Sequence, residues 1–151
     1  MKKKITESIR KLNNRFRFLP PEELAGCLGI SVINYELPKS VSGMYFSAGG
    51  KKAIIISTLI DERFRDYYIS HELGHAVLHD KLNYVFLCNS TNLLRGKYER
   101  EADYFAAELL LGKNPASEYR DRTLDQLSAG FGIPKFVIED WLTDEVRNNR
   151  I

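Results

Sequence analysis

Apolar residues recur at helical spacing near the start of this chain and again in its second half. Four of them follow a helical period in about the first 18 residues: Ile5, Ile9, Leu12 and Phe16. They predict a short amphipathic helix. The segment PPEELAGCLGI predicts a second helix, because Pro21 suits a first helical position and Gly29 suits a helix end.

β-branched and aromatic residues then predict strands. The runs ISVINYEL, SGMYFS and KKAIIIS have strand composition, and the last follows the pair Gly49-Gly50, which suits a hairpin turn. These runs predict a small antiparallel sheet of about three strands within residues 30–57.

The rest of the chain is predicted to be mostly helical. A stretch without proline runs from Asp61 to about His79, and GKYEREADYFAAELLLG predicts a helix from Lys97 to Leu111 that ends at Gly112. Between them, Asp80–Gly96 is predicted to be a connection. Two short helices are predicted to follow: Thr123–Gly130 and Pro134–Arg147. This order of elements indicates an α+β fold, with the small sheet packed on a helical core.

The length of 151 residues favours one domain, residues 1–151. Its predicted parts are N-terminal helices (1–29), the sheet (30–57), two long helices (58–112) and a C-terminal helical segment (113–151). Hydrophobic residues make up 44% and charged residues 28%, as in ordinary globular proteins. The net charge of +2 indicates no attraction to nucleic acid, and none is expected to bind directly.

Targeting and redox features favour the cytoplasm. The basic start is followed by ITESIRKLNNRF rather than by an apolar run, so no export signal is predicted. No apolar run approaches the roughly 18 residues of a membrane span. Cys27 and Cys88 have no metal-binding spacing and are too few for a disulfide scaffold.

The segment YYISHELGHAVLHD carries the strongest chemical signal, since all 3 histidines of the chain lie in it. On a helix, His71 and His75 lie one above the other and can direct two ring nitrogens to one Zn²⁺ ion. Glu72 is placed to reach a water molecule at that ion, as a general base does. The segment therefore predicts a zinc site for hydrolysis of peptide bonds.

A third ligand must come from elsewhere. Glu99 is the best candidate, because a helix packed on the HELGH helix could bring its carboxylate to the metal. Asp103, four residues later, could accept a hydrogen bond from a ligand histidine. Glu101 points away from Glu99 by about 200 degrees and is the weaker choice. His79 is too far along the helix to be a comfortable ligand and is expected to support the site.

An alternative is that the histidines form an ordinary packed or solvated stripe. Gly74 argues against this, because glycine inside a helix costs about 1 kcal/mol and usually has a packing or functional reason. An oxyanion donor is also needed. Four tyrosines are close in sequence, and the sequence does not choose among them: Tyr67, Tyr68, Tyr98 and Tyr104.

The strand KKAIIIS, the HELGHxxxH segment and EREADYFAAELLLG follow one another as in the ImmA/IrrE metallopeptidases, which residues 51–112 closely resemble. The resemblance implies a zincin-like fold, zinc ligands His71, His75 and Glu99, and catalytic base Glu72. Gly112 stands where the family usually has proline, which concerns the exit of that helix and not the metal site.

The resemblance also implies a role for the protein. Members of this family act against helix-turn-helix repressors of phages, integrative elements and chromosomes, so an element-borne anti-repressor is expected. The alternative is a non-catalytic zinc protein that binds and displaces such a repressor. A third hypothesis is DNA binding through LDQLSAGFGIPKFVIEDWL, which resembles a helix-turn-helix in length. Its acidic and apolar second helix makes that less favoured than packing on the core.

Overall fold

The computed structural model describes residues 2–80 and 92–148, with side chains from residue 96 onward in the second range. The predicted connection Asp80–Gly96 therefore lies largely outside the described residues, as does Cys88. The elements up to the end of the sheet are α1 (Lys2–Phe16), α2 (Pro21–Cys27), β1 (Ile30–Tyr35), β2 (Gly43–Ala48) and β3 (Lys51–Ser57). The later elements are η1 (Glu62–Phe64), α3 (Arg65–Leu78), α5 (Asn92–Leu111), η2 (Ala116–Tyr119), α6 (Leu124–Phe131) and α7 (Lys135–Asn148).

The predicted α+β class is confirmed, and so is a sheet of three strands. The strand order is β1-β3-β2, with β3 in the centre. Gly49 and Gly50 both have positive φ, 57° and 77°, which is the geometry of a two-residue hairpin turn between β2 and β3.

The expectation of an antiparallel sheet is wrong for one strand pair. β2 and β3 are antiparallel, but β1 and β3 are parallel, with Ile30 opposite Lys52 and Tyr35 opposite Ser57. The reason is the order of the strands: the chain reverses direction twice between β1 and β3, and β2 occupies the far edge of β3. The composition of a strand predicts extended structure but does not choose its neighbour.

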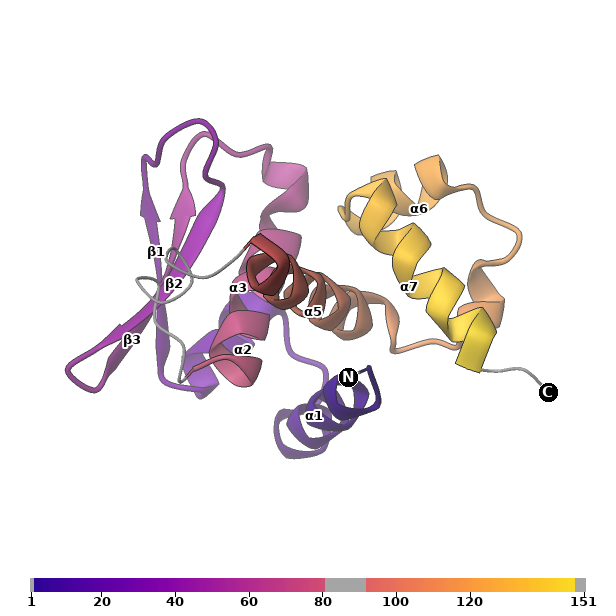
Figure 1. Cartoon of the computed structure of the whole chain (residues 1–151), viewed down its shortest axis with the longest axis horizontal. Helices are drawn as coiled ribbons and strands as arrows, with labels where there is room; N and C mark the ends of the chain where they lie inside the picture. The colour runs from indigo at the N-terminus through magenta and orange to yellow at the C-terminus, as the bar shows by residue number, and fades with distance from the viewer. Residues whose placement is uncertain (1, 81–91, 149–151) are drawn as a thin grey trace.

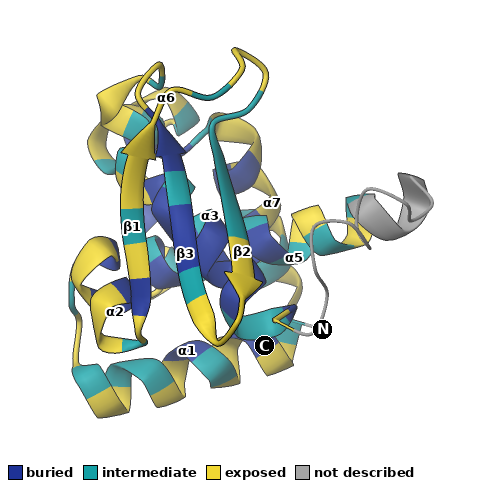
Figure 2. Ribbon diagram, turned by 90° about the vertical axis from the view of Figure 1, so that its left-hand side faces the viewer, coloured by how far each residue is buried: buried dark blue, intermediate teal, exposed yellow. Residues whose placement is uncertain are grey.

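The elements form successive layers. Figure 1 shows the sheet, then α3, then α5, then the pair α6 and α7, with α1 and α2 beneath. In Figure 2 the sheet faces the viewer with α3 behind it. Ile54 and Ile56 of β3 are fully buried, as are Ile69 and Leu73 of α3 and Phe105 of α5. The helix α3 is thus held between the sheet and α5, in the most buried layer.

The C-terminal helices begin and end close to their predicted positions. Thr123 caps α6 in a capping box with Gln126, and Gly132 (φ 64°) ends that helix. A Cβ at Gly132 would lie 2.0 Å from the backbone oxygen of Arg63, so the turn before α7 packs directly on η1.

The apolar face of α7 is directed into the protein. Val137, Ile138 and Trp141 are buried, and the indole Nε1 of Trp141 donates a hydrogen bond to Glu108 of α5 at 2.6 Å. This is the helix that the DNA-binding hypothesis would insert into a groove. Its three buried apolar residues pack on the core, as the competing interpretation expected, whereas Phe136 is 60% exposed.

Gly74 brings α3 and α5 into close contact. A Cβ at position 74 would lie 3.1 Å from the Cα of Ala102 and 3.1 Å from the Cβ of Phe105. The interface therefore has no space for a side chain on α3 at this point. This explains a glycine in the middle of a helix that carries the candidate chemistry.

Gly74→Val is expected to lower the free energy of unfolding by about 1–3 kcal/mol, because it overpacks this interface. Gly26→Ala is the matched control, since a Cβ at Gly26 in α2 meets nothing within 4 Å. The control should be neutral or stabilise the protein by about 0.4–1 kcal/mol. Urea unfolding of the metal-free proteins measures both. Equal stability of Gly74→Val and the wild type would contradict the close-packing explanation.

Candidate metal centre

Two successive turns of α3 direct His71 and His75 toward α5. Their ring centroids are 4.9 Å apart. The side chain of His71 is 12% exposed and that of His75 is 10% exposed, so both rings lie in a mostly dry environment next to the surface. The helical spacing predicted that these two rings would share a face, and the structure brings them together.

Glu99 of α5 lies against both rings. One carboxylate oxygen is 3.0 Å from Nε2 of His71, and the other is 3.1 Å from Nε2 of His75. The side chain of Glu99 is 58% exposed, so the point where these groups meet is open to solvent. Two imidazole nitrogens and a carboxylate converge there, one donor from each of the three predicted ligands.

Glu72 lies on the buried side of the same cluster. Ligand atoms of His71, Glu72 and His75 lie within 4.8 Å of one another. Burial raises the pKa of the Glu72 carboxyl group, although the two histidines and a hydrogen bond from the Tyr45 backbone work in the opposite direction. A raised pKa brings a carboxylate closer to the neutral pH at which a general base is most effective.

The first residue of β2 packs against the side chain of Glu72. Gly43 begins β2, and a Cβ at that position would lie 3.4 Å from Cγ of Glu72 and 3.1 Å from Cδ1 of Ile56. The start of β2 thus passes close to the methylene groups of the Glu72 side chain. A side chain at position 43 would press on both the central strand and Glu72.

Asp103 contacts Nδ1 of His71, the ring nitrogen that does not face Glu99. Its carboxylate is 2.8 Å from Nδ1 of His71 and also accepts a hydrogen bond from the Tyr67 hydroxyl. Burial lowers the pKa of His71, but the hydrogen bonds to Asp103 and Glu99 outweigh it and raise that pKa to about 10 in the metal-free chain. Burial raises the pKa of Glu99, but the hydrogen bonds to His71 and His75 outweigh it, so that the pKa of Glu99 lies below its usual value.

His79 lies beside His75 and is buried. Its Nδ1 is 3.1 Å from Nδ1 of His75, and its Nε2 is 2.6 Å from a carboxylate oxygen of Glu101. Sequence reasoning weighed Glu101 only as a metal ligand and missed this contact. The available signal was His79 itself, because a buried imidazole needs a hydrogen-bond acceptor for its N–H.

Two of the four candidate tyrosines are occupied by other groups. The hydroxyl of Tyr67 donates to Asp103, and that of Tyr104 donates to Glu145 of α7 at 3.2 Å. The ring of Tyr98 packs edge-on against His79, with centroids 4.6 Å apart. Of these four tyrosines, Tyr68 and Tyr98 are therefore the remaining candidates for stabilising an oxyanion.

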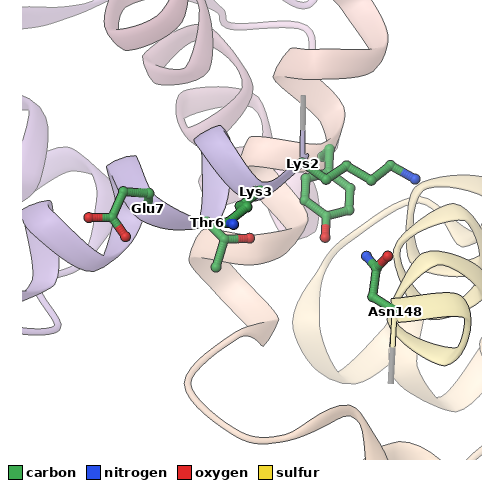
Figure 3. A pocket seen from close by; sticks show the side chains of 6 residues that line it. Lys2, Lys3, Thr6, Glu7 and Asn148 are labelled. Atoms are coloured by element: carbon green, nitrogen blue, oxygen red, sulfur yellow. The ribbon is translucent and has the colours of Figure 1, made fainter. Parts of the chain in front are cut away.

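One hollow of the described surface lies away from the histidines. Its volume is about 680 Å³, and it is lined by Lys2, Lys3, Thr6, Glu7, Tyr104 and Asn148. Figure 3 shows it between α1, α5 and the end of α7. It contains none of the clustered histidines or carboxylates. An ion needs only a few converging donor atoms, so a metal centre does not require a large cavity.

No helix in the described ranges 2–80 and 92–148 is both long and apolar enough to span a membrane.

Comparison with known proteins identifies relatives over most of the chain. The chain is 35% identical over 132 residues to the "Uncharacterized immunity region protein 2" of Bacillus phage phi105, covering 86% of this chain and 84% of the relative. It is 37% identical over 79 residues to "Metallopeptidase ImmA" of Bacillus subtilis (strain 168), covering 50% of this chain and 47% of that protein. No solved structure matches significantly.

The comparison of families gives the same result. The peptidase family described as "IrrE N-terminal-like domain" matches residues 25–142, which include the whole sheet, α3, α5 and the first part of α7. The resemblance drawn from the sequence motifs is therefore confirmed. This chain belongs to the IrrE N-terminal-like family of metallopeptidases.

Proposed function

We propose that this protein is a zinc-dependent endopeptidase in which His71, His75 and Glu99 bind the metal and Glu72 is the catalytic base. The observation that carries the proposal is the convergence of Glu99 on the Nε2 atoms of both histidines, at 3.0 and 3.1 Å. Two nitrogen donors and one carboxylate form a three-residue set that leaves a fourth position of a tetrahedral zinc ion open.

The surroundings of the two histidines favour Glu99 over Glu72 as the third ligand. Nδ1 of each ring already has a partner, Asp103 for His71 and His79 for His75. The nitrogen of each ring that is left to bind a metal is therefore Nε2, and Glu99 touches both of these atoms. Glu72 belongs to the same cluster but is 8% exposed and tied to the β2 backbone, so it is better placed to receive a proton.

Bound zinc would polarise a peptide carbonyl and make a water molecule acidic. The protein's own contribution begins with Glu72, whose carboxylate accepts the proton of the attacking water. The same carboxyl group can then return that proton to the leaving amine. Asp103 and Tyr67 hold the ring of His71 in place during both steps.

The position of β2 at the edge of the sheet suggests how a substrate would lie. β2 is at one end of the strand order, and its first residue packs against the side chain of Glu72. An extended peptide could pair with this edge and so place one peptide bond at the metal. The proposed substrates are therefore unfolded or loop segments of proteins.

We propose that the target is a helix-turn-helix repressor of a phage or mobile element, inactivated by cleavage in the cytoplasm. The immunity-region name of the phage relative and the similarity to ImmA support this choice. The chain 1–151 is proposed to act as a single metallopeptidase domain.

The test combines metal content with cleavage. Untagged protein prepared without chelator should contain about one zinc per chain. Co-expression with a helix-turn-helix repressor from the same source should produce two discrete repressor fragments. Fragments should be absent when the protein is stripped of metal and should return with added zinc. Essentially no zinc after zinc exposure would contradict the proposal.

The raised pKa of His71 gives a pH prediction. At neutral pH the His71 ring is positively charged, with hydrogens on both nitrogens, because its pKa of about 10 lies well above 7. Zinc must displace the hydrogen on Nε2. The apparent zinc affinity should therefore rise by about tenfold per pH unit between roughly pH 6 and pH 9, and fall by the same factor on acidification. Competition with a chelator of known pH dependence measures it. A zinc affinity that is constant over this range would contradict the prediction.

A further inference from the structure

The contact between Nδ1 of His75 and Nδ1 of His79 holds one hydrogen. The two Nδ1 atoms are 3.1 Å apart, and both side chains are mostly buried, at 10% and 4% exposure. One Nδ1 must carry the hydrogen and the other must accept it. If Nε2 of His75 binds zinc as a neutral imidazole, its proton is on Nδ1, and Nδ1 of His79 must be the acceptor.

The other nitrogen of His79 must then carry the hydrogen of that ring. Nε2 of His79 is 2.6 Å from the carboxylate of Glu101, whose side chain is 14% exposed. A carboxylate accepts hydrogen bonds, so this contact is satisfied by an Nε2–H donor and leaves a lone pair on Nδ1. The ring of Tyr98 packs against His79 and holds its plane.

We propose that Glu101 is a positioning residue that acts through His79 to fix the tautomer and orientation of His75. The proposal rests on the proposed function, because it assumes that Nε2 of His75 is a metal ligand. Glu101 does not touch the metal position. It keeps the proton of His79 on Nε2, and His79 in turn keeps the proton of His75 on Nδ1.

The two ligand histidines are thus oriented in different ways. His71 donates directly to Asp103 at 2.8 Å, whereas His75 donates to a second imidazole that donates to Glu101. A carboxylate at the end of each chain of hydrogen bonds makes the metal-binding nitrogen a better donor. This relay of hydrogen bonds from His75 through His79 to Glu101 is needed because His79, the residue that ends α3, stands between His75 and Glu101.

Histidine ring NMR tests the relay directly. The chain has only 3 histidines, so ¹⁵N-labelled imidazoles give three resolvable spin systems. In zinc-loaded wild type, His79 should be the Nε2–H tautomer and His75 the Nδ1–H tautomer. In Glu101→Ala, the Nδ1–H tautomer of His79 should appear in the metal-free protein, and the zinc dissociation constant should rise by about 10–100-fold.

Two further variants make the result specific. Glu101→Gln keeps an oxygen that can accept from His79 and should retain most of the zinc affinity, whereas Glu139→Ala on the exposed face of α7 should behave as wild type. An unchanged dissociation constant in Glu101→Ala overturns the relay, as does a Glu101→Gln variant as weak as Glu101→Ala. If Glu101→Ala fails to fold, an Nδ1–H tautomer of His79 in zinc-loaded wild type overturns it.

The outcomes also separate the relay from the proposed function. Wild type that binds zinc and cleaves its target, with Glu101→Ala binding zinc equally well, would remove the relay alone. Wild type that binds no zinc would overturn the endopeptidase and the relay together.

Discussion

Glu72→Gln is expected to reduce cleavage of the repressor by about 10²–10⁴-fold, the usual contribution of a general base. The amide has nearly the shape of the carboxylate but cannot accept the proton of the attacking water. Zinc content and the free energy of unfolding should be unchanged, because Glu72 is not proposed as a ligand and burial already disfavours its charged form. Cleavage rates with the repressor, and zinc per chain, are the measurements.

Glu139→Gln is the matched control, since it makes the same chemical change at an exposed position on α7. It should cleave at the wild-type rate. Cleavage by Glu72→Gln at the wild-type rate would show that another group is the base. If the wild type and Glu72→Gln both relieve repression in cells without any fragments, the displacement alternative replaces the endopeptidase.

Glu99→Ala is expected to weaken zinc binding by more than the roughly 10–100-fold typical of residues that only support a ligand. It removes one of three ligands and leaves two histidines. Because the Glu99 side chain is 58% exposed, the metal-free variant should fold as wild type does. At a zinc concentration 100 times the wild-type dissociation constant, zinc should stabilise wild type by about 2.7 kcal/mol and the variant by almost nothing.

Chelator competition and thermal unfolding with and without zinc measure these two effects. Glu139→Ala again serves as the control for removal of an acidic side chain. Equal zinc stabilisation of Glu99→Ala and wild type would mean that a different group, Glu72 above all, completes the ligand set. The proposed division of roles between the two carboxylates would then be wrong.

Several features of the fold were predictable from local sequence. The Gly49-Gly50 turn, the capping residue Thr123 and the helical period of α1 each reflect interactions within a few residues. The direction of β1 was not predictable in this way, because parallel and antiparallel strands have similar composition. Helix α5 begins at Asn92 rather than at the predicted Lys97, a boundary that residue patterns define poorly.

For the candidate site, the sequence by itself determined that His71 and His75 share one face of a helix with Glu72 beside them, because a helix fixes the directions of side chains four residues apart. Only the tertiary structure decided which carboxylates meet which nitrogens. Glu99 meets both Nε2 atoms, Asp103 meets His71, and Glu101 meets His79. Such pairings depend on how closely α5 approaches α3. That distance is set by Gly74 and the packing around it, which no pattern within one helix records.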